Sequence, residues 1–449
     1  MKNTPISLRN IVFVILFVFT NTFIQGATIT SKSSGGSWSS SSTSVGGVIP
    51  LSTDQVVIAT TGTSTVTLSG TTSCSSLTVN SASTLAIGRQ SLTVSGAVVN
   101  SGKITLTTGR ITQSGTANFT NSGVLTFTGS GRLYFTGDFT NTGTLTLASA
   151  SIYFTGTNSS ASTVAGFTTT GSVTFQRTSG SVTFTGNVTA GALTVSGSGA
   201  TLNLGSGLTH SFSGSITLSA GTFNGGSSVL NATLLGSSTW INNGGTFTAG
   251  TGTVSLSGPG NQTITGTQTT SFNNLTLSNW GSKILTKIPV VNGILSMEGT
   301  ATVTAAPTYG AASTIQYKGT TSRTVSVEFP TNFSGTGGLI IDQGTGRIVT
   351  LNANKTSFSG NLYIKSGTFD LSTYTINRVS AGGTLTVASG AVLKIGGTNT
   401  LPSNYSTHNI NCNSTIEYSG ASQTVANLNS SQAYGNLTLS GTGTKTLQT

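Results

Sequence analysis

Carboxylates are the side chains of this sequence whose spacing could support chemistry on a polymer. The chain of 449 residues has only 7 Asp and Glu. In a repeating fold such residues meet only when their spacing is close to the repeat length, and Glu328, Asp342 and Asp370 come loosely near an interval of about twenty residues. Paired carboxylates cleave glycosides when they stand roughly 6 to 9 Å apart, and clustered ones bind Ca²⁺. The flanking segments contain no His, so we interpret the three as capping or solvated surface groups and expect no catalytic residue.

The residue types that usually form metal sites, catalytic triads or phosphate-binding loops are not clustered in this sequence. His210 and His408 lie among Thr and Ser without a carboxylate or Cys beside them, which argues against a metal or a triad. Glycine-rich runs such as SGSGATLNLGSG (196–207) are not followed by Lys-Ser or Lys-Thr, and no helix is expected that could hold a phosphate. We therefore interpret them as turn glycines and predict no cofactor. Cys74 and Cys412 are interpreted as small buried residues, too far apart in a repeating fold for a disulfide.

Basic residues are spread singly along the chain. The formal net charge is +11 from 18 Lys and Arg, of which Lys2 and Arg9 lie in the N-terminal segment. Nucleic-acid binding needs cations clustered on one face. The spread therefore predicts no basic stripe and no nucleic-acid partner, and we interpret the cations as groups that keep a strand-rich surface soluble and discourage edge pairing.

A repeat of about twenty residues must position these side chains. The segments VVNSGKITLT (98–107), FTNSGVLTFT (119–128) and FTNTGTLTLA (139–148) align without gaps. The alignment places three asparagines in one column and three glycines in another: Asn100, Asn121 and Asn141, and Gly102, Gly123 and Gly143. We predict that Asn-x-Gly forms a tight corner in which Gly adopts positive φ, and that the asparagines form a structural ladder of stacked side-chain hydrogen bonds.

Strands are indicated by alternation within each repeat. Leu125 and Phe127 alternate with Thr126 and Thr128, which is the pattern of a strand with one buried face. No helical period follows the N-terminal segment. Each repeat carries about three short strands and cannot bury its apolar face alone, so repeats must stack. We predict an all-β fold, a parallel β-helix with coils of about twenty residues that forms a rod roughly 100 Å long.

The organisation along the chain follows from these patterns. Residues 1–26 read as a signal peptide, because an apolar run too short to span a bilayer follows Lys2 and Arg9. We assign 27–85 to an N-terminal cap and first coils, 86–250 to coils of about twenty residues, and 251–449 to longer repeats that stop without a visible cap. Two related segments near 313 and 414 recur after about a hundred residues, which is also the length of a β-sandwich domain and makes an array of sandwiches the alternative.

The segments 35–59, 73–96, 238–258 and 366–407 resemble the repeat-rich secreted proteins of Bacteroidetes. The resemblance covers the chain after the signal peptide, and it implies a large β-helical, adhesin-like surface protein exported by the type IX system. The C-terminal sorting domain of that group is not found in this sequence. Attachment to the cell surface would then depend on a downstream C-terminal region.

These observations favour a secreted, non-enzymatic stalk that contacts extracellular polysaccharide or another surface through many weak contacts. No membrane span is expected after the signal peptide. The alternatives are a carbohydrate-active β-helix protein, such as a polysaccharide lyase or glycosidase, and a glycan-binding or ice-binding module. Columns of outward Thr and aromatic side chains could serve binding, although half or more of the aromatics are expected to pack between coils. These aromatics are Tyr134, Tyr153, Tyr317 and Tyr418.

Overall fold

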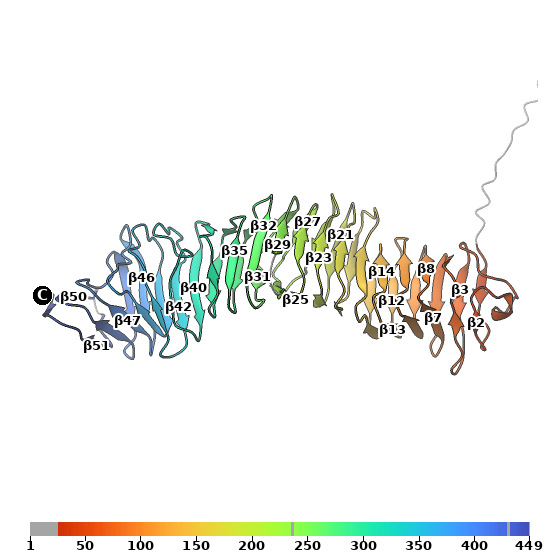
Figure 1. Ribbon diagram of the computed structural model, residues 1–449, viewed down its shortest axis with the longest axis horizontal. Helices are drawn as coiled ribbons and strands as arrows, with labels where there is room; N and C mark the ends of the chain where they lie inside the picture. The colour runs from red at the N-terminus through yellow and green to blue at the C-terminus, as the bar shows by residue number, and fades with distance from the viewer. Residues whose placement is uncertain (1–25, 235–237, 429–431, 449) are drawn as a thin grey trace, which may run out of the picture.

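The protein is a rod of stacked coils in the computed structural model (Figure 1), which describes residues 26–234, 238–428 and 432–448. All of its paired strands within sheets run parallel, and about 18 turns follow one another along the axis. The described N-terminal end and the C-terminal end lie at opposite ends of the rod. The predicted parallel β-helix is therefore confirmed, and the ~4.8 Å spacing of paired strands gives a length of roughly 85 Å.

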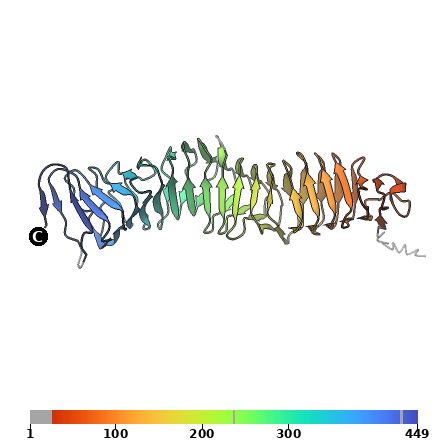
Figure 2. The ribbon, with the colours of Figure 1, turned by 90° about the horizontal axis from the view of Figure 1, so that it is seen from below.

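Each coil passes through up to three sheets in turn. Sheet I has 11 strands from β1 (Thr28–Thr30) to β30 (Thr246–Thr248), and sheet III has 12 strands from β5 (Thr72–Cys74) to β38 (Thr302–Val303). Between them comes sheet II, with 6 strands from β2 (Gly36–Ser37) to β16 (Thr144–Thr146). Figure 2 shows these strands crossing the axis at regular intervals.

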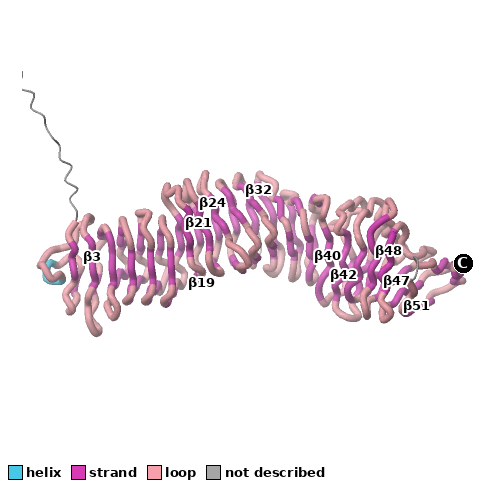
Figure 3. Tube along the Cα trace, turned by 180° about the vertical axis from the view of Figure 1, so that it is seen from behind, coloured by secondary structure: helices cyan, strands magenta, loops and turns pink. Residues whose placement is uncertain are grey.

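Two sheets continue the same pattern toward the C-terminal end. Sheet IV has 12 strands from β19 (Phe167–Thr168) to β48 (Tyr405–Ile410), and it takes the place of sheet II in each coil. Sheet V has 6 strands from β41 (Arg323–Thr324) to β51 (Asn436–Leu439), and it takes the place of sheet III. The strands recur along the whole tube in Figure 3.

The pairing of strands in neighbouring coils shows how many residues form one coil. In sheet I, β12 (Phe119–Asn121) pairs with β9 (Val98–Asn100) and with β15 (Phe139–Asn141), so that the three Asn-x-Gly repeats stack directly on one another. One coil therefore runs from Asn100 to Asn121, and the next runs from Asn121 to Asn141. In sheet IV, Leu362 pairs with Leu385. The coil between these two leucines is slightly longer, so the longer repeats are longer coils of one solenoid.

The core is a continuous apolar column inside the coils. In β13 (Val124–Phe127), Leu125 and Phe127 are buried while Thr126 is half-buried, as the alternation predicts. Aromatic rings pack between coils, with 5.6 Å between the ring centroids of Phe119 and Phe139. Because each coil covers the apolar face of the next, no coil needs a core of its own.

The β-sandwich alternative is wrong, because the related segments of the C-terminal half are strands of stacked coils. The copy that begins at Ser313 forms β40 (Thr314–Gly319) in sheet IV, and the copy that begins at Ser414 forms β49 (Thr415–Tyr418) in sheet V. The same sequence motif therefore forms strands on two different sides of the rod. An alternating strand of this kind needs only one buried face, and the coil provides one on each side.

Helical structure in the described part of the chain is limited to one short 3-10 turn, η1 (Ser41–Thr43). None of the described helices is long and apolar enough to cross a membrane. The expected signal peptide falls almost entirely on residues 1–25, which lie outside the described residues.

Candidate functional site

The asparagine column is a hydrogen-bonded ladder inside the rod. Asn100 Nδ2 donates to Asn121 Oδ1 at 2.6 Å, and Asn121 Nδ2 donates to Asn141 Oδ1 at the same distance of 2.6 Å. Each amide also donates to a strand carbonyl, Asn100 to Val124 O at 3.0 Å and Asn121 to Thr144 O at 3.2 Å. Asn100 and Asn121 are fully buried and Asn141 is half-buried, so the ladder joins coils mainly from inside the rod.

The three aligned glycines are required for a different reason from the expected positive φ. Gly102, Gly123 and Gly143 do not have positive φ. A Cβ on Gly123 would instead lie 2.1 Å from the carbonyl oxygen of Gly102, and one on Gly143 would lie 2.1 Å from that of Gly123. The corners of successive coils are stacked too closely for any side chain, so glycine is needed for contact between coils rather than for its backbone freedom.

Glu328 lies inside the rod, where its carboxylate has structural partners. Its Oε1 accepts hydrogen bonds from Tyr317 Oη at 3.0 Å and from the backbone N–H of Ser326 at 2.9 Å. Glu328 and Tyr317 are fully buried. Burial, and next to it the charge of Glu328, raises the pKa of Tyr317 well above its usual value, so this phenol stays protonated and keeps donating.

Asp342 and Asp370 lie on the outer surface of two different sheets. Asp342, on β42 (Gly338–Gln343) of sheet IV, pairs with Lys365 at 2.8 Å. Burial raises the pKa of Asp342, but hydrogen bonds from Lys365 and Ser366 outweigh it and lower the pKa overall. Asp370, on β45 (Thr368–Asp370) of sheet V, is 4.0 Å from Lys394.

Glu328, Asp342 and Asp370 therefore occupy three separate environments, each with its own partners. The arrangement does not bring two of them together to face one cleft. Within the residues that the structure describes, no group of three or more His, Cys, Asp or Glu could hold a metal ion.

The histidines and cysteines lie at separate positions along the rod. His210 is buried in β25 (Thr209–Phe212), where its Nδ1 accepts from the N–H of Val188 at 3.1 Å and its Nε2 lies 2.8 Å from Leu204 O. Cys74 is buried, and burial raises the pKa of its thiol to about 12. Cys412 is exposed, which corrects the expected burial: it follows β48 in a surface turn, where its side chain does not face the core.

The aromatic residues considered for binding divide into two pairs. Tyr317 and Tyr418 are fully buried between coils. Tyr134 and Tyr153 are half-buried on the outer face of sheet III, where their rings stack with centroids 4.4 Å apart and planes 10° from parallel. Only the second pair belongs to a surface.

Three arginines gather beside these tyrosines around an open hollow. The hollow has a volume of about 430 Å³, within the range typical of ligand sites. Arg110 begins β11 (Arg110–Gln113) and pairs directly with Arg132, the first residue of β14 (Arg132–Phe135). The hollow is lined by Arg89, Ser91, Thr108, Gly109, Arg110, Ser130 and Arg132.

Within the described chain, none of these three arginines forms an ion pair with an acidic residue. The ion pairs found among the described residues all lie after residue 297. Arg110 Nε is buried without a hydrogen-bond partner, and its guanidinium carbon lies 5.8 Å from the centroid of the Tyr134 ring. Arg89 and Arg132 are exposed. The result is a locally positive, hydroxyl-lined hollow on sheet III, which we call the arginine hollow.

The expectation that no basic stripe forms is wrong for this part of the rod. Arg89, Arg110 and Arg132 stand alone in the sequence, but each is about one coil length from the next, as Asn100 is from Asn121. That periodicity is the signal that sequence reasoning missed. The repeat pairs Arg110 directly with Arg132, while Arg89 lies on the preceding coil, two residues before Ser91, which pairs with Arg110.

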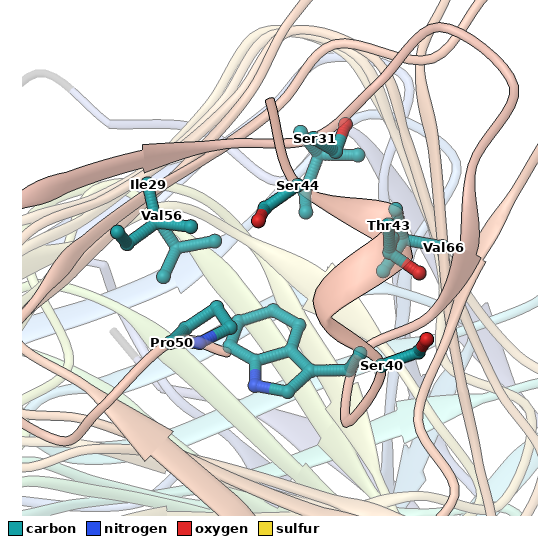
Figure 4. A pocket seen from close by; sticks show the side chains of 10 residues that line it. Ile29, Ser31, Ser40, Thr43, Ser44, Pro50, Val56 and Val66 are labelled. Atoms are coloured by element: carbon teal, nitrogen blue, oxygen red, sulfur yellow. The ribbon is translucent and has the colours of Figure 1, made fainter. Parts of the chain in front are cut away.

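A second hollow lies at the N-terminal end of the rod (Figure 4). Ile29, Pro50 and Val56 lie on one side of it and Thr43 and Ser44 on the other. Its volume is about 20 Å³, which suits one water molecule and not a ligand.

No family model, no curated protein and no solved structure matches this chain.

Proposed function

We propose that this β-solenoid is the stalk of a secreted or cell-surface protein, and that it contacts extracellular polysaccharide or another surface along its length. The observation that supports the proposal most is the stack of about 18 turns, in which strands of successive coils pair in parallel along the described chain. Such a stack gives reach, and it repeats the same outward positions at intervals of ~4.8 Å.

The proposal includes no catalytic step. Glu328 is enclosed in the core, and Asp342 and Asp370 are each held beside a lysine on separate sheets. The resemblance to repeat-rich Bacteroidetes proteins adds the expectation of adhesin-like function and export by the type IX system. Those features rest on the resemblance alone.

Adhesion through repeated weak contacts predicts a graded loss. Binding of the purified chain to polysaccharide-coated surfaces should weaken stepwise as whole coils are removed, because each coil contributes to avidity. Surface plasmon resonance on a coated chip measures this directly. Complete loss after replacement of one exposed residue, with the fold intact, would argue for a single strong site and against the proposed stalk.

A further inference from the structure

We propose that the arginine hollow on sheet III is a binding site for an acidic polysaccharide, and that it recognises carboxylate or sulfate groups on consecutive sugar units. The inference rests on the proposed function, because it names the ligand class for one part of a rod proposed to contact surfaces. It is carried by three observations: unpaired arginines on neighbouring coils, an open hollow lined by hydroxyl groups, and an adjacent tyrosine pair.

The arrangement of the arginines should lower the stability of the folded protein. Arg110 and Arg132 are direct partners on adjacent parallel strands, and like charges in that position repel. No carboxylate within the described chain lies at ion-pair distance from either of them. An anion placed between the two guanidinium groups would relieve this repulsion and provide acceptors for their N–H groups.

The chemistry of the lining fits acidic sugars. Guanidinium groups bind carboxylate and sulfate oxygens through paired, charge-assisted hydrogen bonds. Ser91, Thr108 and Ser130 add hydroxyl groups that can bond to sugar hydroxyls. Tyr134 on β14 packs its ring beside the guanidinium group of Arg110, and Tyr153 on β17 (Ser151–Phe154) stacks on Tyr134.

The direction of the site also suits a linear polymer. Arg89 precedes β8 (Ser91–Val94), and Ser91 pairs with Arg110, which pairs with Arg132. The three cations thus lie on three successive coils, because β8, β11 and β14 are neighbours in sheet III; β8 and β14 are labelled near each other in Figure 1. A polysaccharide lying along the axis would place successive acidic units against Arg110 and Arg132, ~4.8 Å apart from coil to coil, with Arg89 on the coil before them.

Two other polyanionic partners fit less well. Nucleic-acid binding depends on many phosphate contacts over an extended basic face, whereas the hollow holds three arginines. An anionic membrane surface would favour apolar side chains at the centre of the contact, and the residues lining the hollow are polar or glycine.

The test is equilibrium binding of the purified full chain to defined polymers by isothermal titration calorimetry at low and at physiological ionic strength. Polygalacturonate probes carboxylates, dextran sulfate probes sulfates, neutral dextran is the uncharged control, and a single-stranded oligonucleotide probes nucleic acid. We expect binding to one or both acidic polysaccharides, with neutral dextran and the oligonucleotide at least tenfold weaker.

Arg132→Gln is the main variant, and Arg347→Gln is its matched control. Arg347 is also exposed but lies outside the hollow, in the C-terminal part of the chain, so both variants have the same net charge. Arg132→Gln should weaken acidic-polysaccharide binding about tenfold, the loss expected for one charge-assisted contact. Arg347→Gln should change it less than twofold, and Arg132→Lys should restore part of the loss.

A second readout separates binding from a structural role. Since Arg110 and Arg132 repel, Arg132→Gln should raise the melting temperature at low salt without ligand, whereas a structural arginine would lower it. Equal weakening by Arg132→Gln and Arg347→Gln, or equal binding of the oligonucleotide, would overturn the proposed site. If both outcomes occur while coated surfaces still bind the rod in a coil-dependent way, the stalk function stands and only the site fails. If the coated surfaces bind nothing, the stalk function fails as well.

Discussion

At the scale of single residues, the asparagine ladder is directional. Each amide donates toward the C-terminal coil, so Asn100 Oδ1 at the start has no hydrogen-bond partner. The residue paired with Asn100 in the preceding coil is Val79, which has no N–H in its side chain. The ladder thus begins where the sequence changes from an apolar side chain to an amide, and its interior member Asn121 is the residue on which both neighbours depend.

Replacing Asn121 should destabilise the rod in a way that depends on the replacement. Asn121→Val removes the donor to Asn141 and should lower the free energy of unfolding by about 1 to 2 kcal/mol. Asn121→Asp should cost more at neutral pH, because a buried carboxylate would face the acceptors Asn141 Oδ1 and Thr144 O without a proton to donate. Urea unfolding followed by circular dichroism measures both.

Acidification provides the control for this prediction. Burial raises the pKa of a carboxyl group, so an aspartic acid at position 121 should bind a proton as the pH falls and become a donor again. The defect of Asn121→Asp should shrink between pH 7 and pH 4, while that of Asn121→Val should not change. Identical defects at both pH values would show that the ladder bonds contribute nothing specific.

A buried lysine should contribute a stability that increases with pH, opposite in direction to the effect of the carboxyl group in Asn121→Asp. Lys283 is fully buried and donates to Gln262 Oε1 at 2.8 Å. Burial lowers its pKa to about 8, whereas an unfolded lysine titrates near 10.4. Between these values the unfolded lysine binds more protons than the folded one, so the contribution of Lys283 to stability should rise with pH from about 8 to 10, by on the order of 1 kcal/mol per pH unit. Buried groups with a raised pKa, such as the thiol of Cys74, act in the opposite direction, so the contribution of Lys283 is measured as a difference between variants.

Two substitutions check the source of this rise. Lys283→Gln should make the slope of melting temperature against pH between pH 8 and pH 10 less positive than in the unchanged protein. The contribution of Lys355, whose pKa burial also lowers to about 8, should remain. Lys365→Gln, at an exposed lysine whose pKa is raised by its hydrogen bond to Asp342, should leave the slope in this window unchanged. A slope equal to that of the unchanged protein in both Lys283→Gln and Lys355→Met would refute the explanation.

At the scale of elements, the corners limit how closely coils can stack. Gly123→Ala places a Cβ 2.1 Å from the backbone carbonyl oxygen of Gly102, which requires the coils to move apart. We expect a loss of about 1 to 3 kcal/mol in the free energy of unfolding. Gly70→Ala is the matched control, since its Cβ would meet nothing within 4 Å and its φ is not positive. It should be neutral or slightly stabilising, and equal losses in the two variants would contradict the stacking argument.

The elements themselves could be predicted from the sequence because their signal is local. Leu125, Thr126 and Phe127 alternate within one strand, and the pairing of that strand follows from the repeat length. Side chains that meet across coils were harder to predict. Arg110 and Arg132 are a whole coil apart in the sequence and meet through stacking, and the exposure of Cys412 depends on a turn that no repeat column contains. Lys283 has no sequence feature that distinguishes it from the exposed lysines.

At the scale of the whole molecule, a stack of equivalent coils should tolerate the loss of one complete coil. Residues 122–141 span one register unit, because Asn121 pairs directly with Asn141. Their deletion joins Asn121 to Thr142 and leaves Asn100 paired with Asn121 in the same column. The rod should fold with a similar far-ultraviolet circular dichroism spectrum, and its maximum dimension in small-angle X-ray scattering should shorten by ~5 Å.

Deletion of half of this unit, residues 122–131, should behave differently. It removes β13 with the corner that precedes it, so the coil loses its strand in sheet II while those in sheets I and III remain. The apolar side chains of the neighbouring strands would then lose their cover, and the paired backbone groups their partners. We expect a fall in melting temperature several times larger than for deletion of the whole unit, although fewer residues are removed. If the shorter deletion were the milder one, stability would not be set by complete coils, and the description of the rod as a stack of equivalent units would have to be abandoned.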